Sequence, residues 1–326
     1  MLSRVADSLY WMSRYLERAE HTARLLDVNL NQMLDQTTDL AEQRWERLLE
    51  SLHASVPGDA TASAFAITNA LTLDAGNSAS IIACISAARE NARQVREQIS
   101  SEMWEQLNRV YLEVRRTRLE QIWNNEPHAF FTFIKEGIHL FQGITDATMT
   151  HGEGWQFIQL GRLIERVSAT GALLDVHFRL LPNSLDNLDE FNYLDWVGLL
   201  KSCTAFEAYC NVYTANVQPH HVAEFLLLHP DNPRSVRFCV ASLQTALQAV
   251  ARSTAPQSAK RLERLAGRLR ADLDYAQVDE IMAENSHDFL EKIQRQCDQI
   301  HAAIYQAYIA YPIEAALMQS AAISSQ

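Results

Sequence analysis

The fold class follows from one segment near the N-terminus, Tyr10-Trp11-Met12-Ser13-Arg14-Tyr15-Leu16-Glu17-Arg18, which recurs as Ile158-Gln159-Leu160-Gly161-Arg162-Leu163-Ile164-Glu165-Arg166. Each copy continues to a threonine and then to Leu-Leu-Asp, 148 residues apart. Trp45–Ser51 and Trp196–Ser202 are a second matching pair, 151 residues apart. Asn77–Ile81 and Asn232–Val236 are a third, 155 apart. Three blocks in the same order, with an offset that grows as loops lengthen, indicate a duplicated unit of roughly 150 residues.

The pattern within these segments predicts helices. In the first copy, apolar residues three and four positions apart share one helix face: Leu9, Met12, Leu16, Ala19, Ala23, Leu26 and Leu30. Gly (10) and Pro (8) are scarce, which leaves few breakers for the many turns of a β fold. Later helices are expected at about 42–54, 79–120, 128–145, 192–215, 233–252, 257–272 and 287–311.

The sequence therefore predicts an all-α helical bundle of two tandem, internally duplicated halves that form one compact unit. The first helical repeat is expected at 1–150, the second at 151–312, and a disordered tail at 313–326.

The composition of the chain limits which partners and which cellular compartment can be expected. The net charge of −12 makes the surface repel phosphate backbones, so no nucleic-acid partner is expected. No apolar run approaches the roughly 18 residues of a membrane span, and the repeat begins too early for a cleavable leader, so no membrane partner is expected. Five cysteines without a C-x-x-C pair are typical of reduced thiols in a cytoplasmic protein.

The repeated motif carries a charged face opposite the apolar one. Arg14, Glu17, Arg18 and His21 share that face in the first copy, and the second copy has Arg162, Glu165, Arg166 and Ala169 at the equivalent positions. One interpretation is a set of buried Arg–Glu pairs that lock helices together; the other is an anion-binding site. If the copies pack about a pseudo-two-fold axis with the motif helices antiparallel, Arg14 or Arg18 faces Glu165, and Arg162 or Arg166 faces Glu17.

Two further charged groups are candidates for binding a substrate or an anion. Arg89, Glu90 and Arg93 lie close together in Ala88–Glu97, where arginines on one stripe could bind carboxylate or phosphate, or form a salt-bridged outer face. Arg234 falls in an expected first helical turn, where positive charge is disfavoured. A bound anion or an acidic neighbour would relieve that conflict.

A metal site is the alternative interpretation. Glu136-x-x-His139 and Glu284-x-x-His287 have the spacing found in di-iron helical bundles, and Glu17 and Glu165 could add two carboxylates. The two Glu-x-x-His segments are out of register with the repeat, however, so we expect no metal and no other cofactor. The sequence contains no P-loop, dinucleotide fingerprint or G-x-S-x-G elbow.

Several of these segments resemble the bacterial alpha-E domain family. The opening, Met1–Ala6 and Tyr10–Glu20, looks like the family's signature. Further segments that fit it are Ala88–Arg93, His139–Gly143, Gly154-Trp155, Leu160–Arg162, Glu165-Arg166 and Pro233–Val236. The resemblance covers about 1–310; Ser13 stands where Gly is common in the family, and Gly137 where some members have a charged residue.

The resemblance implies an all-helical protein that works with other chains. The family's members resemble partners of circularly permuted ATP-grasp proteins, of transglutaminase-like proteins and of proteasome-related hydrolases. This context implies an amide- or peptide-forming modification system in which another chain binds ATP. We therefore expect a helical subunit that binds a peptide or amino-acid substrate, or the ATP-grasp partner, through its Arg/Glu faces. The competing hypothesis is a stand-alone metalloenzyme built on Glu17, Glu136, His139 and Glu165.

Overall fold

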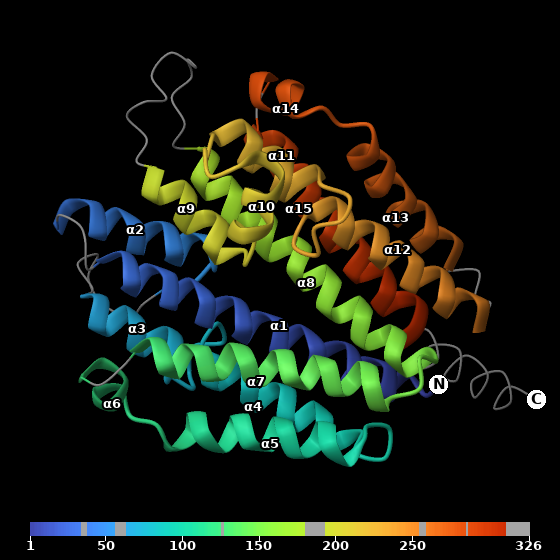
Figure 1. The fold of residues 1–326 in the computed structure, drawn as a ribbon. Coiled ribbons are helices and arrows are strands. Elements are labelled where there is room, and N and C mark those ends of the chain that lie inside the picture. The colour runs from blue at the N-terminus through green and yellow to red at the C-terminus, as the bar shows by residue number, and fades with distance from the viewer. Residues whose placement is uncertain are drawn as a thin grey trace, which may run out of the picture.

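The computed structural model describes residues 1–33, 38–55, 63–124, 127–179, 193–253, 259–284 and 286–310, and within these ranges the ordered elements are helices, with no strand. The all-α prediction is therefore confirmed (Figure 1). The expected disordered tail, 313–326, lies outside the described residues.

The first part of the chain is built around one long helix. The elements are α1 (Ser3–Gln32), α2 (Thr38–Ser51), α3 (Ala64–Thr72), α4 (Ile81–Gln94), α5 (Ser101–Arg116), α6 (Leu119–Asn124) and α7 (Pro127–Thr148). Helices α4 and α7 pack directly on α1, and α5 packs on both α4 and α7.

The second part has the same order of long helices around its own long helix. The elements are α8 (Glu153–Phe178), α9 (Tyr193–Ser202), α10 (Phe206–Tyr213), α11 (Pro219–Leu228), α12 (Val236–Ser253), α13 (Ala259–Asp274), α14 (Val278–Glu284), α15 (Ser286–Ile304) and a π-helical turn η3 (Tyr305–Ala310). Helices α12 and α15 pack on α8, and α13 packs on both of them, as α4, α7 and α5 do around α1.

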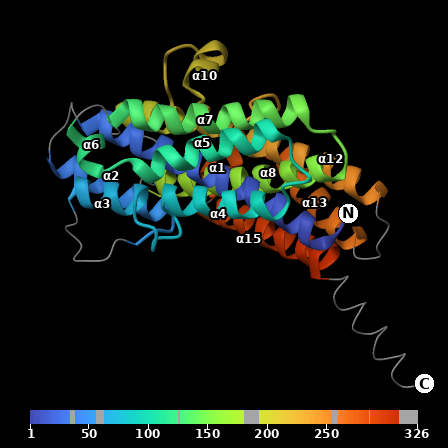
Figure 2. The same ribbon diagram turned by 90° about the horizontal axis from the view of Figure 1, so that it is seen from below.

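Helices α1 and α8 form the centre of the molecule, where they pack against each other (Figures 1 and 2). The sequence pattern identifies one apolar face on each of these helices as buried. In the structure, residues outside that face are buried as well. In α1 the buried residues include Glu17, Glu20 and Arg24, and in α8 they include Glu165 and Arg166. A helix surrounded by other helices has no solvated face, so its charged side chains need partners inside the protein.

The two central helices run in the same direction, which corrects the expected antiparallel arrangement. The amino group of Met1 contacts Glu153 at 2.7 Å near the start of the two helices, and Nε of Arg14 contacts Glu165 at 2.7 Å further along both of them. Partners thus advance together along both segments, as they must in a parallel pair. Figure 1 shows both helices starting on the same side of the molecule. The periodicity of a helix fixes its buried face, but not the direction of the helix that covers that face.

The turns before α4 and α12 use the same hydrogen bonds. Ser80 Oγ donates to the carbonyl of Asp74 and accepts from the amide of Ala83. Ser235 Oγ, 155 residues later, donates to the carbonyl of His229 and accepts from the amide of Phe238. A serine that accepts from the third residue of a helix is a standard N-cap, which explains why helices begin at these two related segments.

Two of the expected helices are each interrupted. The 79–120 segment forms α4 and α5, and Ser100 starts the second one by accepting from the amide of Met103 at 3.1 Å. The 192–215 segment forms α9 and α10 because the chain turns at Thr204, whose φ is +50°. Helices α3, α6, α11 and α14 were not expected. Within the described residues, no helix is long and apolar enough to cross a membrane.

Candidate functional site

Glu17 is the centre of the charged cluster between α1 and α8. Arg166 binds both oxygens of this carboxylate, through Nε at 2.7 Å and Nη2 at 2.9 Å, and Arg234 adds a third bond through Nη1 at 2.8 Å. Burial alone would raise the pKa of Glu17, but these two guanidinium groups outweigh it and hold the pKa well below its ordinary value. The carboxylate therefore stays ionised at neutral pH and is a poor general base.

Glu165 occupies the reciprocal position on α8. It accepts from Nε of Arg14 at 2.7 Å and from Nε of Arg18 at 2.6 Å. Burial raises the pKa of Glu165, and the charges of Arg14 and Arg18 lower it by more. The expected exchange is therefore present: Arg14 and Arg18 face Glu165, and Arg166 faces Glu17.

Arg234 lies just before α12 rather than in its first turn, and its partners are acidic side chains. Besides Glu17, it binds Glu20 through Nη2 at 3.1 and 3.2 Å. Glu20 also forms an ion pair with Arg24, one turn further along α1. These neighbours account for an arginine near a helix start without any bound anion.

The cluster as a whole contains more guanidinium groups than carboxylates. Three carboxylates, Glu17, Glu20 and Glu165, are paired with five arginines: Arg14, Arg18, Arg24, Arg166 and Arg234. An excess of two positive charges thus lies inside a protein whose net charge is −12. Additional positive charge is unfavourable there, and burial together with Arg234 lowers the pKa of both His21 and His139 to about 4.

The remaining candidates are not part of this cluster. Arg93 and Glu90 pair with each other on the exposed face of α4, with side chains 61% and 49% exposed. Arg89 donates to Asn108 at 2.6 Å and lies over the Tyr111 ring at 4.7 Å. This group is therefore a salt-bridged, aromatic-packed outer face. Arg162 lies between α7 and α8, where it donates to the side-chain oxygens of Gln142 and Gln159.

The side chains of the alternative metal site are not brought together. Glu17 and Glu165 are held by different arginines, and His139 contacts Glu20 at 3.2 Å rather than either of them. Glu136 is exposed on α7. Of the second segment, His287 lies against Asp175 at 2.6 Å. Within the described ranges, no three His, Cys, Asp or Glu side chains are grouped as metal ligands.

The buried thiols are not activated as nucleophiles. Burial raises the pKa of Cys84 and Cys297 to about 12, and that of Cys203 and Cys239 to about 11. A thiol reacts through its thiolate, so these four groups are inert at neutral pH. These four thiols therefore offer no activated nucleophile at neutral pH.

A cavity of about 670 Å³ opens beside Glu165 and was not anticipated from the sequence. It lies between α1, α8 and α15 and reaches the end of α2 and the turn before α4; among its lining residues are Arg14, Arg18, His21, Ala79, Glu165 and Asp298. His21 is 94% buried, and its Nε2 atom has no hydrogen-bond partner in the part of the chain that the structure describes. The one sequence signal was His21 itself, which has alanine (Ala169) at the equivalent position of the second copy.

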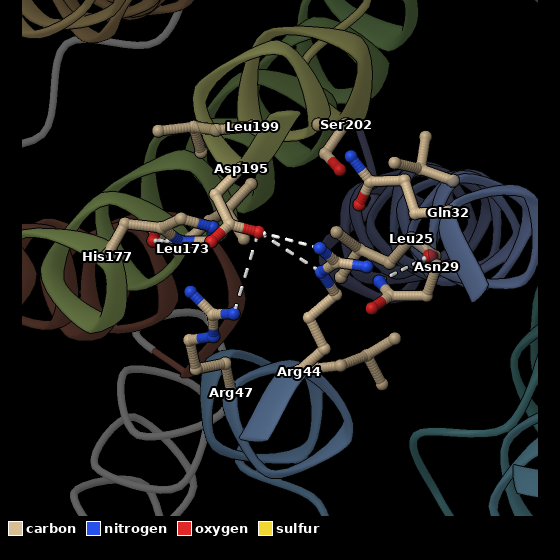
Figure 3. A pocket seen from close by; sticks show the side chains of 13 residues that line it. Leu25, Asn29, Gln32, Arg44, Arg47, Leu173, His177, Asp195, Leu199 and Ser202 are labelled. Atoms are coloured by element: carbon tan, nitrogen blue, oxygen red, sulfur yellow. Dashed lines mark hydrogen bonds and ion pairs between the residues drawn. The ribbon is translucent and has the colours of Figure 1, made fainter. Parts of the chain in front are cut away.

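A second, smaller pocket lies between α2, the C-terminal ends of α1 and α8, and α9 (Figure 3). Its volume is about 30 Å³, room for little more than water. Asp195 lies at its centre and accepts from Nε and Nη2 of Arg44 at 3.1 and 2.9 Å, while Arg47 approaches to 3.7 Å. Figure 3 shows both guanidinium groups turned toward this one carboxylate. The pocket is thus an ion-paired joint between helices.

The fold and the site define an all-helical protein whose two central helices are joined by buried Arg–Glu pairs. A sequence profile described as "a predicted alpha-helical domain with a conserved ER motif" matches residues 1–309, so the chain belongs to the Alpha-E family. Glu17-Arg18 and Glu165-Arg166 are Glu-Arg dipeptides of this kind.

Curated relatives of the chain are much longer than it is. An uncharacterised protein of Mycobacterium bovis and one of Mycobacterium tuberculosis are each 24% identical over 323 residues, which cover 92% of this chain and 35% of theirs. A counterpart from a second M. tuberculosis strain is 23% identical over the same length. The chain therefore spans about a third of the length of these relatives. No solved structure matches it significantly.

Proposed function

We propose that this protein is a helical subunit of an ATP-grasp-dependent system that forms amide or peptide bonds, and that it binds the substrate or the ATP-grasp partner rather than catalysing the reaction. The observation that carries the proposal is that the carboxylates of the repeated motif are buried and ion-paired. Glu17 and Glu165 are neutralised by arginines across the α1–α8 contact, with pKa values below the ordinary range. Groups held in this way maintain a shape and a charge pattern, but they do not transfer protons near neutral pH.

Two further points support a binding role. The cavity beside Glu165 has a volume within the roughly 300–1,000 Å³ of small-molecule sites. The resemblance to partners of ATP-grasp proteins supplies the class of reaction, and a transglutaminase-like protein is the second partner that this resemblance implies. The four buried, unreactive thiols support our placing of this system in the cytoplasm.

A reconstitution with purified proteins tests the proposal. The ATP-grasp protein of the same organism is mixed with this chain, and the complex is measured by size-exclusion chromatography with light scattering. ADP release is then measured with and without a mixture of amino acids as acceptors. We expect a complex, and at least tenfold faster acceptor-dependent ADP release when this chain is present. ADP release that is equally fast without the chain, together with no complex, would contradict the proposal.

A further inference from the structure

The cavity beside Glu165 occupies the place that an arginine side chain takes in the other half of the molecule. Ala79 lines the cavity, in the turn before α4. The matching residue in the turn before α12 is Arg234, 155 residues later, whose guanidinium group fills the space beside Glu17 and Glu20. The small side chain of Ala79 leaves the equivalent space beside Glu165 open.

Hydrogen-bond donors remain available at the inner end of this cavity. Arg14 and Arg18 both bind Glu165 through Nε, and no described residue accepts a hydrogen bond from the Nη atoms of Arg18. The Arg18 side chain is 30% exposed, so its outer edge can reach a ligand in the cavity. Among the described residues the neighbouring Nε2 atom of His21 has no hydrogen-bond partner, and a buried polar atom of that kind costs free energy until a ligand satisfies it.

The outer part of the cavity has the opposite charge. Glu291 and Asp298 of α15 line it, together with Glu50 and Asp175. Arg179 pairs with Glu50 and Asp175, and Arg295 with Glu291, whereas Asp298 has no ion-pair partner among the described residues. A ligand that carries only negative charge, such as a phosphate, would therefore be repelled at this end.

We propose that this cavity binds a short zwitterionic peptide or a free amino acid. The ligand's carboxylate accepts hydrogen bonds from the Arg18 Nη atoms and from His21 Nε2, and its ammonium group lies at Asp298. An arginine and a carboxylate form charge-assisted hydrogen bonds, which are about twice as strong as neutral ones. This inference rests on the proposed function, because it identifies the substrate-binding site of the subunit.

Peptide binding to the purified chain is measured by isothermal titration calorimetry with trialanine that has both ends free. Two matched probes are trialanine amidated at the C-terminus and trialanine acetylated at the N-terminus. We expect trialanine to bind, and each blocked peptide to bind at least tenfold more weakly. Absence of trialanine binding, or equal affinity for the amidated peptide, overturns the inference. This comparison uses the natural sequence and needs no variant.

A substitution locates the site. Ala79→Arg places in the cavity the side chain that Arg234 supplies in the other half, and Ala75→Arg adds the same charge to the exposed part of the same turn. We expect Ala79→Arg to weaken trialanine binding at least tenfold and Ala75→Arg to leave it within twofold, with thermal unfolding confirming that both variants fold. Unchanged binding by folded Ala79→Arg overturns the inference. A chain that forms the ATP-grasp complex but binds no peptide refutes this inference alone, and a chain that binds trialanine but forms no complex refutes the proposed partner alone.

Discussion

Glu17 of α1 and Arg166 of α8, which lie 149 positions apart in the chain, form a bidentate ion pair. Both side chains are more than 90% buried. Arg18 and Glu165 form the reciprocal pair with the roles of the helices exchanged, at 2.6 Å. Charges removed from water in this way are costly to leave without a partner. The Glu-Arg dipeptide therefore has the same structural consequence in both copies of the motif: it joins the two central helices.

Removal of the Glu17 carboxylate should destabilise the protein strongly. Glu17→Ala leaves Arg166 and Arg234 buried without this anion, and we expect the free energy of unfolding to fall by about 3–5 kcal/mol. Glu90→Ala is the matched control, because its partner Arg93 is exposed. That change should leave the free energy of unfolding essentially unchanged, because solvent screens an exposed ion pair. Urea unfolding followed by circular dichroism measures both, and equal effects would contradict the assignment.

The contact between α1 and α8 should not tolerate a side chain at Gly161. A Cβ atom there would collide with the carbonyl oxygen of Tyr10 and with Ser13 Oγ, and the backbone oxygen cannot swing away as a flexible side chain would. Gly161→Ala should cost about 1–3 kcal/mol.

Gly143→Ala is the control for that change. Gly143 lies inside α7, and no atom of the described residues lies within 4 Å of the position that its Cβ would take, so alanine there should stabilise the protein by up to about 1 kcal/mol. Thermal unfolding of the two variants should move in opposite directions. A neutral Gly161→Ala would show that the helices are further apart than described.

Stability should fall as the pH falls from about 6.5 toward 4. His21 has a pKa of about 4 when folded, because burial and then Arg234 disfavour its charged form, whereas an unfolded histidine has a pKa of about 6.5. The unfolded chain therefore binds a proton in this window that the folded chain does not. The stability is fully present above the unfolded pKa, and lowering the pH removes up to about 3 kcal/mol of it through this one group.

His21→Gln tests this contribution. Urea unfolding at pH 7 and at pH 5 should show a smaller loss of stability for the variant than for the natural protein. His139 and His177, whose pKa values are also about 4, contribute in the same direction in both proteins. An identical loss in the two proteins would mean that His21 is not held neutral by its surroundings.

Substitution of Asp195, which pairs with two arginines of α2, should also destabilise the protein. Asp195→Asn leaves Arg44 and Arg47 facing each other with side chains only 7% and 13% exposed, so we expect a loss of about 2–4 kcal/mol. Asp274→Asn is the control: its pair with Arg237 is about 30% exposed on each side, and the change should cost less than about 1 kcal/mol. A loss at Asp195 no larger than at Asp274 would contradict the buried joint.

The sequence predicted the helical class and the Arg–Glu exchange because both are recorded in the repeated segment. Residues of one helix face recur at fixed spacing, and charges kept on that face in both copies indicate mutual partners. The direction of α8 relative to α1 was predicted wrongly. The spacing of residues along one face of a helix is the same whether the neighbouring helix is parallel or antiparallel. The breaks at Ser100 and Thr204 depend on local capping and on one residue with positive φ, which apolar periodicity does not reveal.

The cavity could not have been predicted in the same way. The cavity is open because the side chain of Ala79 is too small to fill it, and a small residue in a turn does not by itself indicate a cavity. Its meaning comes from the comparison with Arg234, which requires knowing that both turns face the same pair of helices. His21 carried a partial signal, because it shares the charged face of the motif and has no histidine counterpart at Ala169.

A double-mutant cycle on Glu17 and Arg166 tests most directly whether the motif residues join α1 to α8. The free energy of unfolding is measured for the natural protein, Glu17→Gln, Arg166→Gln and the double variant. We predict that each single change destabilises the protein and that the double variant recovers part of the loss, with a coupling energy of about 1–3 kcal/mol. Coupling near zero, with both single variants as stable as the natural protein, would contradict the account and leave these residues free to bind a ligand.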